Sequence, residues 1–382
     1  MHVAALPPYL TRADEPIVNS IAPALPIDIA SYRNAPADAP SLDTLARPLR
    51  DLRLSVIDQC NFRCTYCMPR ANFGADYAFL PSSQWLPFEQ MIKIARAFTS
   101  LGVEKIRITG GEPLLRRGLE SLIESLAALP ALNGQPVEIA LTTNGSLLAA
   151  KARSLRDAGL GRVTVSLDAV DDAIFGRMSD ASVPVSRILA GIEAAQAAGL
   201  APVKVNAVIE RGVNDSQILP LVRQFRHTGV AVRFIEYMDV GGARFWSGDK
   251  VLTAIQMREI IESAYPLMPV GDGDPAGTAI RYRHADGAGE VGFVASMSHP
   301  FCGACTRARV SADGKLYTCL FATDGTDLRP WLADTTPVEQ LAAAVRRRWL
   351  HRDDRYSELR AALGARRPGK GYPTVRMSLV GG

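Results

Sequence analysis

The chain has 382 residues, a length that predicts one large domain or two of ordinary size. Hydrophobic residues make up 47% of the chain and charged residues 21%, which excludes collagen-like, coiled-coil and wholly disordered proteins. The net charge of +4 is too small to predict nucleic-acid binding. No uncharged apolar stretch reaches the roughly 18 residues of a transmembrane helix. We therefore expect neither nucleic acid nor a membrane as a partner.

Residues 1–46 are rich in proline and alanine and show no helical or strand period. This composition predicts a mobile N-terminal extension. The opening segment MHVAALPPYL has no basic part followed by an apolar core, so no signal peptide is predicted. We accordingly expect a cytoplasmic protein.

From about residue 50, short β-type runs alternate with amphipathic helical segments. The predicted strands are 52–57, 105–109, 137–142, 162–167, 203–209 and 230–235. The predicted helices between them are 88–101, 119–129, 147–158, 185–198 and 217–228. Serial βα units form a parallel sheet, so the predicted fold is α/β, an incomplete (β/α)6 TIM-like barrel spanning residues 47–264 and open on one side. Its chemistry is expected at the carboxyl ends of the strands.

The pattern changes at about residue 265, and residues 265–382 are expected to form a C-terminal region that binds a cluster. Residues 265–290 are rich in glycine and predict loops. Short strands are predicted at 291–296, 307–310 and 316–320, followed by a helix at 338–350.

Six cysteines fall into two triplets, with none left over. The triplets are Cys60, Cys64, Cys67 and Cys302, Cys305, Cys319. Clustered thiols in a reducing compartment indicate metal or redox chemistry, and thiolates suit iron–sulfur clusters and zinc. Three cysteines on a [4Fe–4S] cluster leave one iron open to a small molecule. A structural zinc would need a fourth ligand, which the first triplet lacks nearby and which His299 could supply to the second.

The first triplet lies in the run CNFRCTYC at 60–67, which resembles the signature of radical S-adenosylmethionine (SAM) enzymes. The run TGGEP at 109–113, after the second predicted strand, resembles their SAM-contacting motif. The resemblance implies that SAM chelates the open iron and that one electron cleaves it to methionine and a 5′-deoxyadenosyl radical. The protein would orient and shield that radical.

The second triplet lies in the runs FCGACTRAR at 301–309 and SADGKLYTCLF at 311–321, which resemble the GTP 3′,8-cyclase family. The resemblance extends from about residue 49 to the terminal Gly-Gly. It implies radical cyclisation of GTP to (8S)-3′,8-cyclo-7,8-dihydroguanosine 5′-triphosphate, the first step of molybdenum cofactor biosynthesis. The radical would take the ribose H3′, and the resulting carbon radical would attack guanine C8. The resemblance also implies an electron donor and a downstream cyclic pyranopterin monophosphate synthase, and it leaves a homodimer open.

The same resemblance implies roles for individual residues. Two [4Fe–4S] clusters are implied, one for SAM on Cys60, Cys64 and Cys67 and one for GTP on Cys302, Cys305 and Cys319. The implied SAM contacts are Tyr66, Gly111, Ser166 and Met238. The implied GTP contacts are Arg53, Arg107, Thr142, Lys204, Arg307, Ala308 and Arg309. Catalytic roles are implied for the first three cysteines and for Arg307, Arg309, Gly381 and Gly382, with the Gly-Gly tail reaching the active site.

The placement of three of these cations can be interpreted without the resemblance. Arg53, Arg107 and Lys204 each interrupt an otherwise apolar strand. A buried cation needs an anionic partner, so these side chains either bind a triphosphate or pair with acidic residues of the barrel. Two further hypotheses remain for the whole chain: another radical SAM enzyme, such as a peptide-modifying maturase, and a zinc-stabilised binding module without catalysis.

Overall fold

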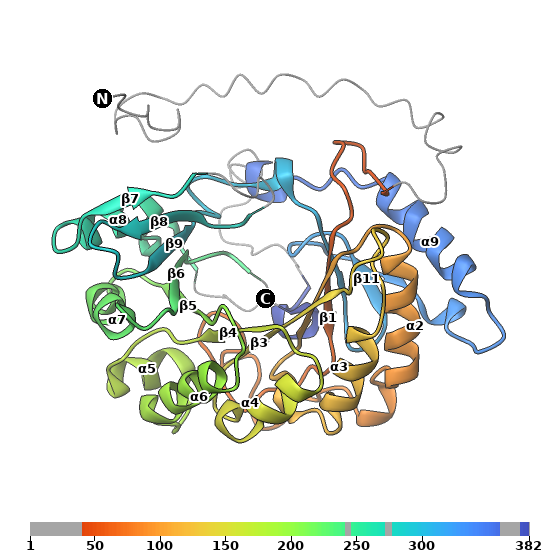
Figure 1. Cartoon of the computed structure of the whole chain (residues 1–382), viewed down its shortest axis with the longest axis horizontal. Coiled ribbons are helices and arrows are strands. Elements are labelled where there is room, and N and C mark those ends of the chain that lie inside the picture. Colours follow the sequence, from red (N-terminus) through yellow and green to blue (C-terminus); the bar gives the residue numbers. More distant parts are fainter. Residues whose placement is uncertain (1–39, 241–245, 272–276, 360–374, 382) are drawn as a thin grey trace.

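The structure is a computed structural model that describes residues 40–240, 246–271, 277–359 and 375–381. Six parallel strands form its centre: β1 Asp51–Ser55, β2 Lys105–Thr109, β3 Glu138–Thr143, β4 Arg162–Ser166, β5 Lys204–Ile209 and β6 Ala231–Glu236. The helices between and after them are α2 Phe88–Thr99, α3 Leu119–Ala127, α4 Leu148–Asp157, α5 Asp172–Ser179, α6 Val185–Ala197, α7 Ile218–Phe225 and α8 Ala254–Glu262. Figure 1 shows the strands as an open arc with the helices along its outer side.

The C-terminal elements extend both edges of this sheet. They are β7 Leu267–Pro269, β8 Ile280–His284, β9 Glu290–Val294, β10 Arg307–Val310, β11 Lys315–Tyr317, β12 Thr326–Asp327, and the helices α9 Val338–Leu350 and α11 Met377–Val380. The strand order is β12-β11-β10-β1-β2-β3-β4-β5-β6-β9-β8-β7, with β10 parallel to β1 and β9 parallel to β6. The two ends of this sheet do not pair with each other among the described strands. The incomplete (β/α) barrel expected from the sequence is therefore confirmed.

Alternation along the central strands separates two environments. Leu52, Leu54, Ile106 and Ile108 are fully buried in the core between the sheet and the outer helices. The residues between them turn toward the inside of the arc, where register places Arg53 beside Arg107. The apolar face holds the barrel together, and the opposite face is free to carry polar side chains.

Three parts of the predicted element pattern are wrong. Residues 265–290, expected to be loop, contain β7 and β8, and the run IRYRH of β8 did carry a strand signal, because its arginines alternate with buried residues. The helices α5 and α8 were not expected. The start of α8 carried a usable signal, since Thr253 and Gln256 form a capping box there.

Residues 40–46 also differ from the expectation of a mobile extension up to residue 46. Ser41 and Asp43 are buried, and Leu42 pairs with Pro48 in an isolated bridge. This short segment belongs to the folded body, while residues 1–39 lie outside the described part of the chain. None of the described helices is both long and apolar enough to cross a bilayer.

Candidate active site

The first cysteine triplet lies in the loop that follows β1. The loop is held by its own arginine, because Arg63 donates hydrogen bonds to the main-chain oxygens of Cys60 at 2.7 Å and Phe73 at 3.1 Å. The amide of Phe62 donates to Sγ of Cys60 at 3.3 Å. All three thiols are free and half-buried, so the loop presents a compact set of soft donors.

The glycine pair after β2 packs directly against this loop. The amide of Gly111 donates to the main-chain oxygen of Ile57 at 2.7 Å. A Cβ on Gly111 would lie 2.1 Å from the main-chain oxygen of Gln59, and one on Gly110 would lie 2.4 Å from that of Ile57. Any side chain here would push the two loops apart. The closeness of the TGGEP turn to the cysteine loop thus depends on glycine.

Glu112 fixes the rest of that turn. Its carboxylate is buried and accepts hydrogen bonds from Thr143 Oγ1 at 2.7 Å, from the amide of Asn144 at 2.7 Å and from the amide of Leu114 at 3.0 Å. Burial raises the pKa of Glu112 to about 7 even though these three bonds lower it. Through Glu112, the ends of β2 and β3 hold each other in place beside Cys60.

Tyr66 ties the cysteine loop to the end of β4. Its hydroxyl donates to Asp168 at 2.9 Å, and the other oxygen of Asp168 accepts from the amide of Val208 at 2.8 Å. Burial raises the pKa of Asp168 to about 6, while the bonds from Val208 and Tyr66 lower it. Among the other expected SAM contacts, Ser166 ends β4 and Met238 follows β6. All of these positions lie at the carboxyl ends of strands, as expected for the catalytic rim.

The interior of the arc contains a cavity of about 310 Å³. Six of the seven expected GTP contacts line it together with Met238 and the second cysteine triplet: Arg53, Arg107, Thr142, Lys204, Arg307, Arg309, Cys302, Cys305 and Cys319. The seventh, Ala308, is fully buried in the hydrophobic core instead, because it occupies the alternate position on β10. Its side chain therefore does not reach the cavity.

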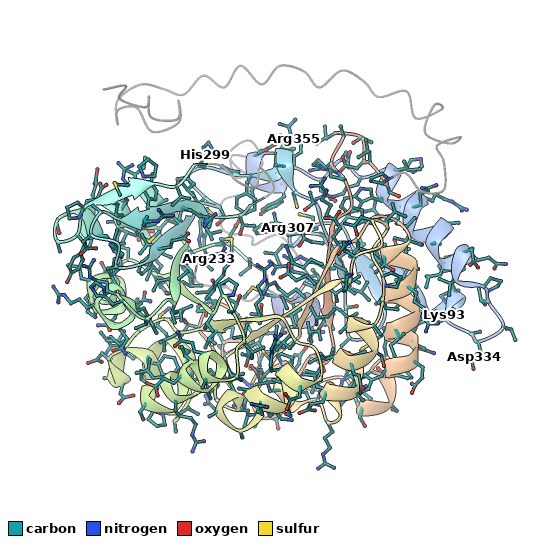
Figure 2. The ribbon with its side chains drawn as sticks, viewed as in Figure 1. Lys93, Arg233, His299, Arg307, Asp334 and Arg355 are labelled. Atoms are coloured by element: carbon teal, nitrogen blue, oxygen red, sulfur yellow. The ribbon has the colours of Figure 1, made fainter. Side chains whose placement is uncertain are left out.

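The charge of this cavity is strongly one-sided. Eight basic side chains and one carboxylate line it: Arg53, Lys105, Arg107, Arg162, Lys204, Arg233, Arg307, Arg309 and Asp51. Lys105 pairs with Asp51, and Arg162 pairs with Glu138. Within the described residues, the other six cations form no salt bridge to a carboxylate. Figure 2 shows Arg233 of β6 and Arg307 of β10 both inside the arc, whereas Lys93 and Asp334 lie at its outer edge.

Sequence reasoning missed Lys105, Arg162 and Arg233. Their signal was the one used for Arg53, a cation at an alternate position of an apolar strand, as in the run VRFIE around Arg233. It also missed Asn206, which stands beside Arg233 in register. The side-chain oxygen of Asn206 is buried without a hydrogen-bond partner in the described part of the chain. An unpartnered acceptor in this cavity is available to a ligand that donates hydrogen bonds.

Mutual repulsion and burial shift the titration of these cations. Burial lowers the pKa of Lys204 to about 7, and the charges of Arg233, Arg162 and Arg107 lower it further in the same direction. Burial likewise lowers the pKa of Arg107 and of Arg309 to about 10. The pKa of Arg53 falls too, because it is buried and faces Arg309, Arg107 and Arg307. A polyanion in this cavity would reverse these effects.

The second triplet belongs to two segments. Cys302 begins the short η6 turn Cys302–Ala304 before β10, Cys305 directly follows this turn, and Cys319 follows β11. Burial raises the pKa of Cys305, but the charges of Arg307 and Arg352 outweigh it and bring the value to about 6. A thiolate is therefore available at neutral pH. Three soft donors beside a cavity fit a cluster that leaves one iron open.

Zinc has weaker support at this second triplet. His299, the candidate fourth ligand, is exposed and does not line the cavity with the cysteines. Over the described ranges, no group of three or more His, Cys, Asp or Glu side chains is arranged to hold a single metal ion. The fit of a polynuclear cluster at either triplet rests on the number and kind of donors.

The C-terminal tail enters the arc. In Figure 1 helix α11 lies inside the curve of the strands. Arg309 donates a hydrogen bond to the main-chain oxygen of Gly381, and Val380 is fully buried. Gly381 has a φ of +73°, and a Cβ there would lie 2.0 Å from Cγ2 of Thr109 at the end of β2. Gly382 lies outside the described residues.

Comparison with known proteins agrees with this geometry. Residues 54–225 match the model of the Radical SAM superfamily, and residues 230–358 match the model described as Molybdenum Cofactor Synthesis C. A GTP 3′,8-cyclase of Xanthomonas axonopodis pv. citri is 53% identical over 344 residues, which cover 90% of this chain and 99% of the relative. The GTP 3′,8-cyclase of Acidothermus cellulolyticus is 48% identical and also covers 90% of this chain and 99% of its own length.

Solved structures show the same fold at low sequence identity. The structure of Streptococcus suis SuiB bound to S-adenosylmethionine superposes with a TM-score of 0.51 at 16% identity, over 78% of this chain and 68% of that chain. A second structure of SuiB gives a TM-score of 0.53 at 16% identity, over 82% of this chain and 68% of that chain. Taken with the relatives above, the chain belongs to the GTP 3′,8-cyclase family of radical SAM enzymes, whose cofactors include SAM and a [4Fe–4S] cluster.

Proposed function

We propose that this chain converts GTP to (8S)-3′,8-cyclo-7,8-dihydroguanosine 5′-triphosphate, the first step of molybdenum cofactor biosynthesis. The reaction removes the ribose H3′ as a hydrogen atom, joins C3′ to guanine C8, and takes up one electron from the donor and one proton, so the mass of the nucleotide is unchanged. The observation that carries the proposal is one cavity lined by eight cations, six of them without a carboxylate partner in the described chain, beside three free thiols. The family membership supports the same activity.

The cations of the cavity bind the triphosphate in this proposal. A nucleoside triphosphate carries about three to four negative charges, and desolvated guanidinium groups are well suited to its phosphate oxygens. Arg107 is already oriented, because its Nη1 donates to Thr142 Oγ1 and Thr164 Oγ1, each at 3.2 Å. Lys204 and Arg233 add charge from the neighbouring strands β5 and β6. Burying six unpaired cations is unfavourable until an anion arrives, which favours occupancy by a polyanion.

The rim of the barrel holds the radical-generating cofactors. Cys60, Cys64 and Cys67 would hold the [4Fe–4S] cluster, and Tyr66, Gly111, Ser166 and Met238 would contact SAM. When bound, this pair supplies the one-electron cleavage that produces the 5′-deoxyadenosyl radical. The contribution of the chain is positional: the glycine contacts and the Glu112 network keep the cysteine loop close to the end of β2.

The second triplet would bind the base of the substrate. Cys302, Cys305 and Cys319 would hold a second [4Fe–4S] cluster, which supplies an open iron to coordinate the guanine. Arg307 stacks its guanidinium over Phe301 at 5.0 Å and so keeps its charge beside Cys305. Met238 lines the same cavity as these cysteines, which brings a SAM contact and the GTP contacts to one space.

The tail and the region boundaries complete the proposal. Gly381 and Gly382 would support radical initiation, with Arg309 holding the tail through its bond to Gly381. Residues 47–264 would form the radical SAM barrel and residues 265–382 the region of the second cluster. An electron donor would reduce the clusters, and the product would pass to a cyclic pyranopterin monophosphate synthase. We place this chemistry in the cytoplasm.

The proposal is tested by incubating anaerobically reconstituted protein with SAM, a reductant and GTP. We expect 5′-deoxyadenosine and a cyclised nucleotide of unchanged mass to form together. Cys64→Ala should abolish both products. Cys305→Ala should abolish the nucleotide product while SAM cleavage remains. Formation of 5′-deoxyadenosine with GTP unchanged in the wild type would refute the cyclase and favour another radical SAM reaction.

A further inference from the structure

A buried cluster of three charged side chains lies behind the second cysteine triplet. It consists of Asp43, Arg47 and Arg352, whose side chains are 0%, 2% and 2% exposed. Arg47 Nε donates to Asp43 Oδ2 at 2.6 Å, and Arg352 Nη1 donates to the same oxygen at 3.0 Å. We call this group the Arg–Asp–Arg triad. No step of the proposed reaction uses it.

The triad contacts the main chain of two of the cysteines and of the residue before the third. Arg47 Nη1 donates to the main-chain oxygen of Cys302 at 2.8 Å. Arg352 Nη1 donates to that of Cys305 at 2.7 Å, and its Nε donates to that of Thr318, the residue before Cys319, at 3.1 Å. Charge-assisted hydrogen bonds of this kind are short and strong when buried. The main chain at Cys302, at Cys305 and next to Cys319 is therefore anchored by the same group of charges.

Two of these anchors lie at the open end of the antiparallel hairpin formed by β10 and β11. Cys305 precedes β10 and Cys319 follows β11, so both cysteines lie at that end, beyond the paired residues Arg309 with Tyr317 and Val310 with Leu316. The forked guanidinium of Arg352 fixes the two segments there, with Nη1 on the main-chain oxygen of Cys305 and Nε on that of Thr318. Asp43 then joins Arg352 to Arg47 and so brings Cys302 into the same unit.

The surroundings hold the triad rigidly. Trp349 lies under Arg352, with the guanidinium carbon 4.5 Å from the ring, and its Nε1 donates to the main-chain oxygen of Arg47 at 3.1 Å. Thr44 Oγ1 donates to the main-chain oxygen of Arg352 at 2.6 Å. Removing one partner of a buried ion pair leaves an uncompensated charge, so the three side chains act as a unit.

We propose that Asp43, Arg47 and Arg352 are positioning residues for the iron–sulfur cluster of the second triplet, setting the spacing of its three cysteines. The inference rests on the second cluster of the proposed function. The triad acts on the cluster through the backbone and makes no contact with GTP or SAM in this proposal.

The test compares Asp43→Asn and Arg352→Lys with the wild type. Asp43→Asn keeps the shape of the side chain and removes the charge that joins the arginines. Arg352→Lys keeps a charge but offers a single nitrogen in place of the Nη1 and Nε that reach Cys305 and Thr318, so it does not reproduce the two anchors in the same geometry. Iron and sulfide per chain are measured after anaerobic reconstitution, together with the paramagnetic resonance spectrum of the reduced protein with and without GTP.

We expect the wild type to bind about eight iron atoms and both variants about half as many, as two clusters become one. The variants should lose the spectral change on adding GTP but still cleave SAM. The control is Leu341→Ala, which opens a cavity in the fully buried face of α9 without touching the triad. Its thermal stability should fall while its iron content and GTP-dependent spectrum stay as in the wild type.

Circular dichroism shows whether each variant folds. If Asp43→Asn does not fold, the comparison of Arg352→Lys with the wild type tests the proposal. Full iron and an unchanged GTP-dependent spectrum in a folded triad variant would overturn the positioning role alone. The positioning role would also be overturned if Leu341→Ala lost iron in proportion to its loss of thermal stability. A general loss of stability would then account for the loss of iron from the triad variants. A wild type that binds only about four irons would overturn the second cluster itself, and the triad's role with it.

Discussion

The guanidinium of Arg309 donates a hydrogen bond to the main-chain oxygen of Gly381, a residue 72 positions further along the chain. The same strand, β10, carries Arg307 into the cavity, and β10 pairs in parallel with β1. The C-terminal tail is thereby attached to the strand that presents two of the cavity's cations. The tail therefore reaches the wall of the cavity.

Gly381→Ala should displace the tail. Its new Cβ would lie 2.0 Å from Thr109 Cγ2, and alanine is strained at a φ of +73°. Because a misplacement of about 1 Å near the reacting groups can cost a hundredfold in rate, we expect a loss of that order in cyclised product. Iron content and GTP affinity should stay as in the wild type. Product formation and GTP binding are measured on the same reconstituted samples.

The double variant Gly381→Ala with Thr109→Ala is the matched control for this prediction. Removing Cγ2 and Oγ1 of Thr109 relieves the two closest contacts, so part of the activity should return. The strain of the backbone would remain, and recovery should therefore be incomplete. Equal activity of the single and double variants would show that the contact with Thr109 does not determine the position of the tail.

Arg233→Leu should weaken GTP binding without loss of iron. Arg233 lines the cavity from β6 and forms no salt bridge to a carboxylate within the described chain. Losing a hydrogen bond to a charged group costs about 1.5–3 kcal/mol, which corresponds to a roughly 10- to 100-fold weaker affinity. Arg223→Leu, at an exposed position of α7 outside the cavity, is the control and should bind GTP normally. An unchanged affinity in Arg233→Leu would remove β6 from the triphosphate site.

GTP affinity should fall as the pH rises above 7. The pKa of Lys204 is lowered to about 7 by burial and by neighbouring arginines, and a bound triphosphate would raise it again. Above pH 7 binding therefore takes up a proton, and the dissociation constant should increase by up to about tenfold per pH unit. Calorimetry above about pH 7.5, where the terminal phosphate is fully ionised, isolates this effect.

The variant Lys204→Arg tests whether the proton taken up on GTP binding is bound by Lys204. Arginine remains charged over the same interval, so the variant should bind GTP with little dependence on pH. A wild-type affinity that stays constant between about pH 7.5 and 9 would place Lys204 away from the phosphates. A pH dependence that survives in Lys204→Arg would assign the proton to another group.

In protein without iron, Cys305 should react with iodoacetamide faster than Cys60 or Cys67. Burial raises the pKa of Cys305, but Arg307 and Arg352 bring it to about 6, whereas burial raises that of Cys60 to about 11 and that of Cys67 to about 12. All three thiols are half-buried, so access alone does not distinguish them. Peptide mass spectrometry at about pH 7.5 measures the three rates. Equal rates would contradict the charge assigned to this part of the site.

Much of the barrel and the site could be predicted from local sequence. The alternation of strand and helix patterns in the sequence predicts β1–β6, and the spacing of the cysteines predicts both triplets. Arg53 was recognised because a cation inside an apolar strand is unusual. Arg162 and Arg233 carry the same signal in β4 and β6 and could have been found in the same way.

The remaining features depend on contacts between distant parts of the chain. Nothing near Asp43 shows that its carboxylate meets Arg352, which is 309 residues away. The pairing of β10 with β1 brings residue Arg309 beside Arg53, and no local period predicts that register. Ala308 was assigned to GTP with its neighbours, yet strand alternation buries it in the core. Such relationships arise only when the sheet has formed.

The most direct test of the account uses GTP that carries deuterium at C3′ of the ribose. Anaerobically reconstituted protein is incubated with this substrate, SAM and a reductant, and both products are analysed by mass spectrometry. We predict that one deuterium appears in 5′-deoxyadenosine for each cyclised nucleotide formed. Deuterium-free 5′-deoxyadenosine, with all deuterium retained in unchanged GTP, would contradict the claim that this cavity presents the ribose to the radical.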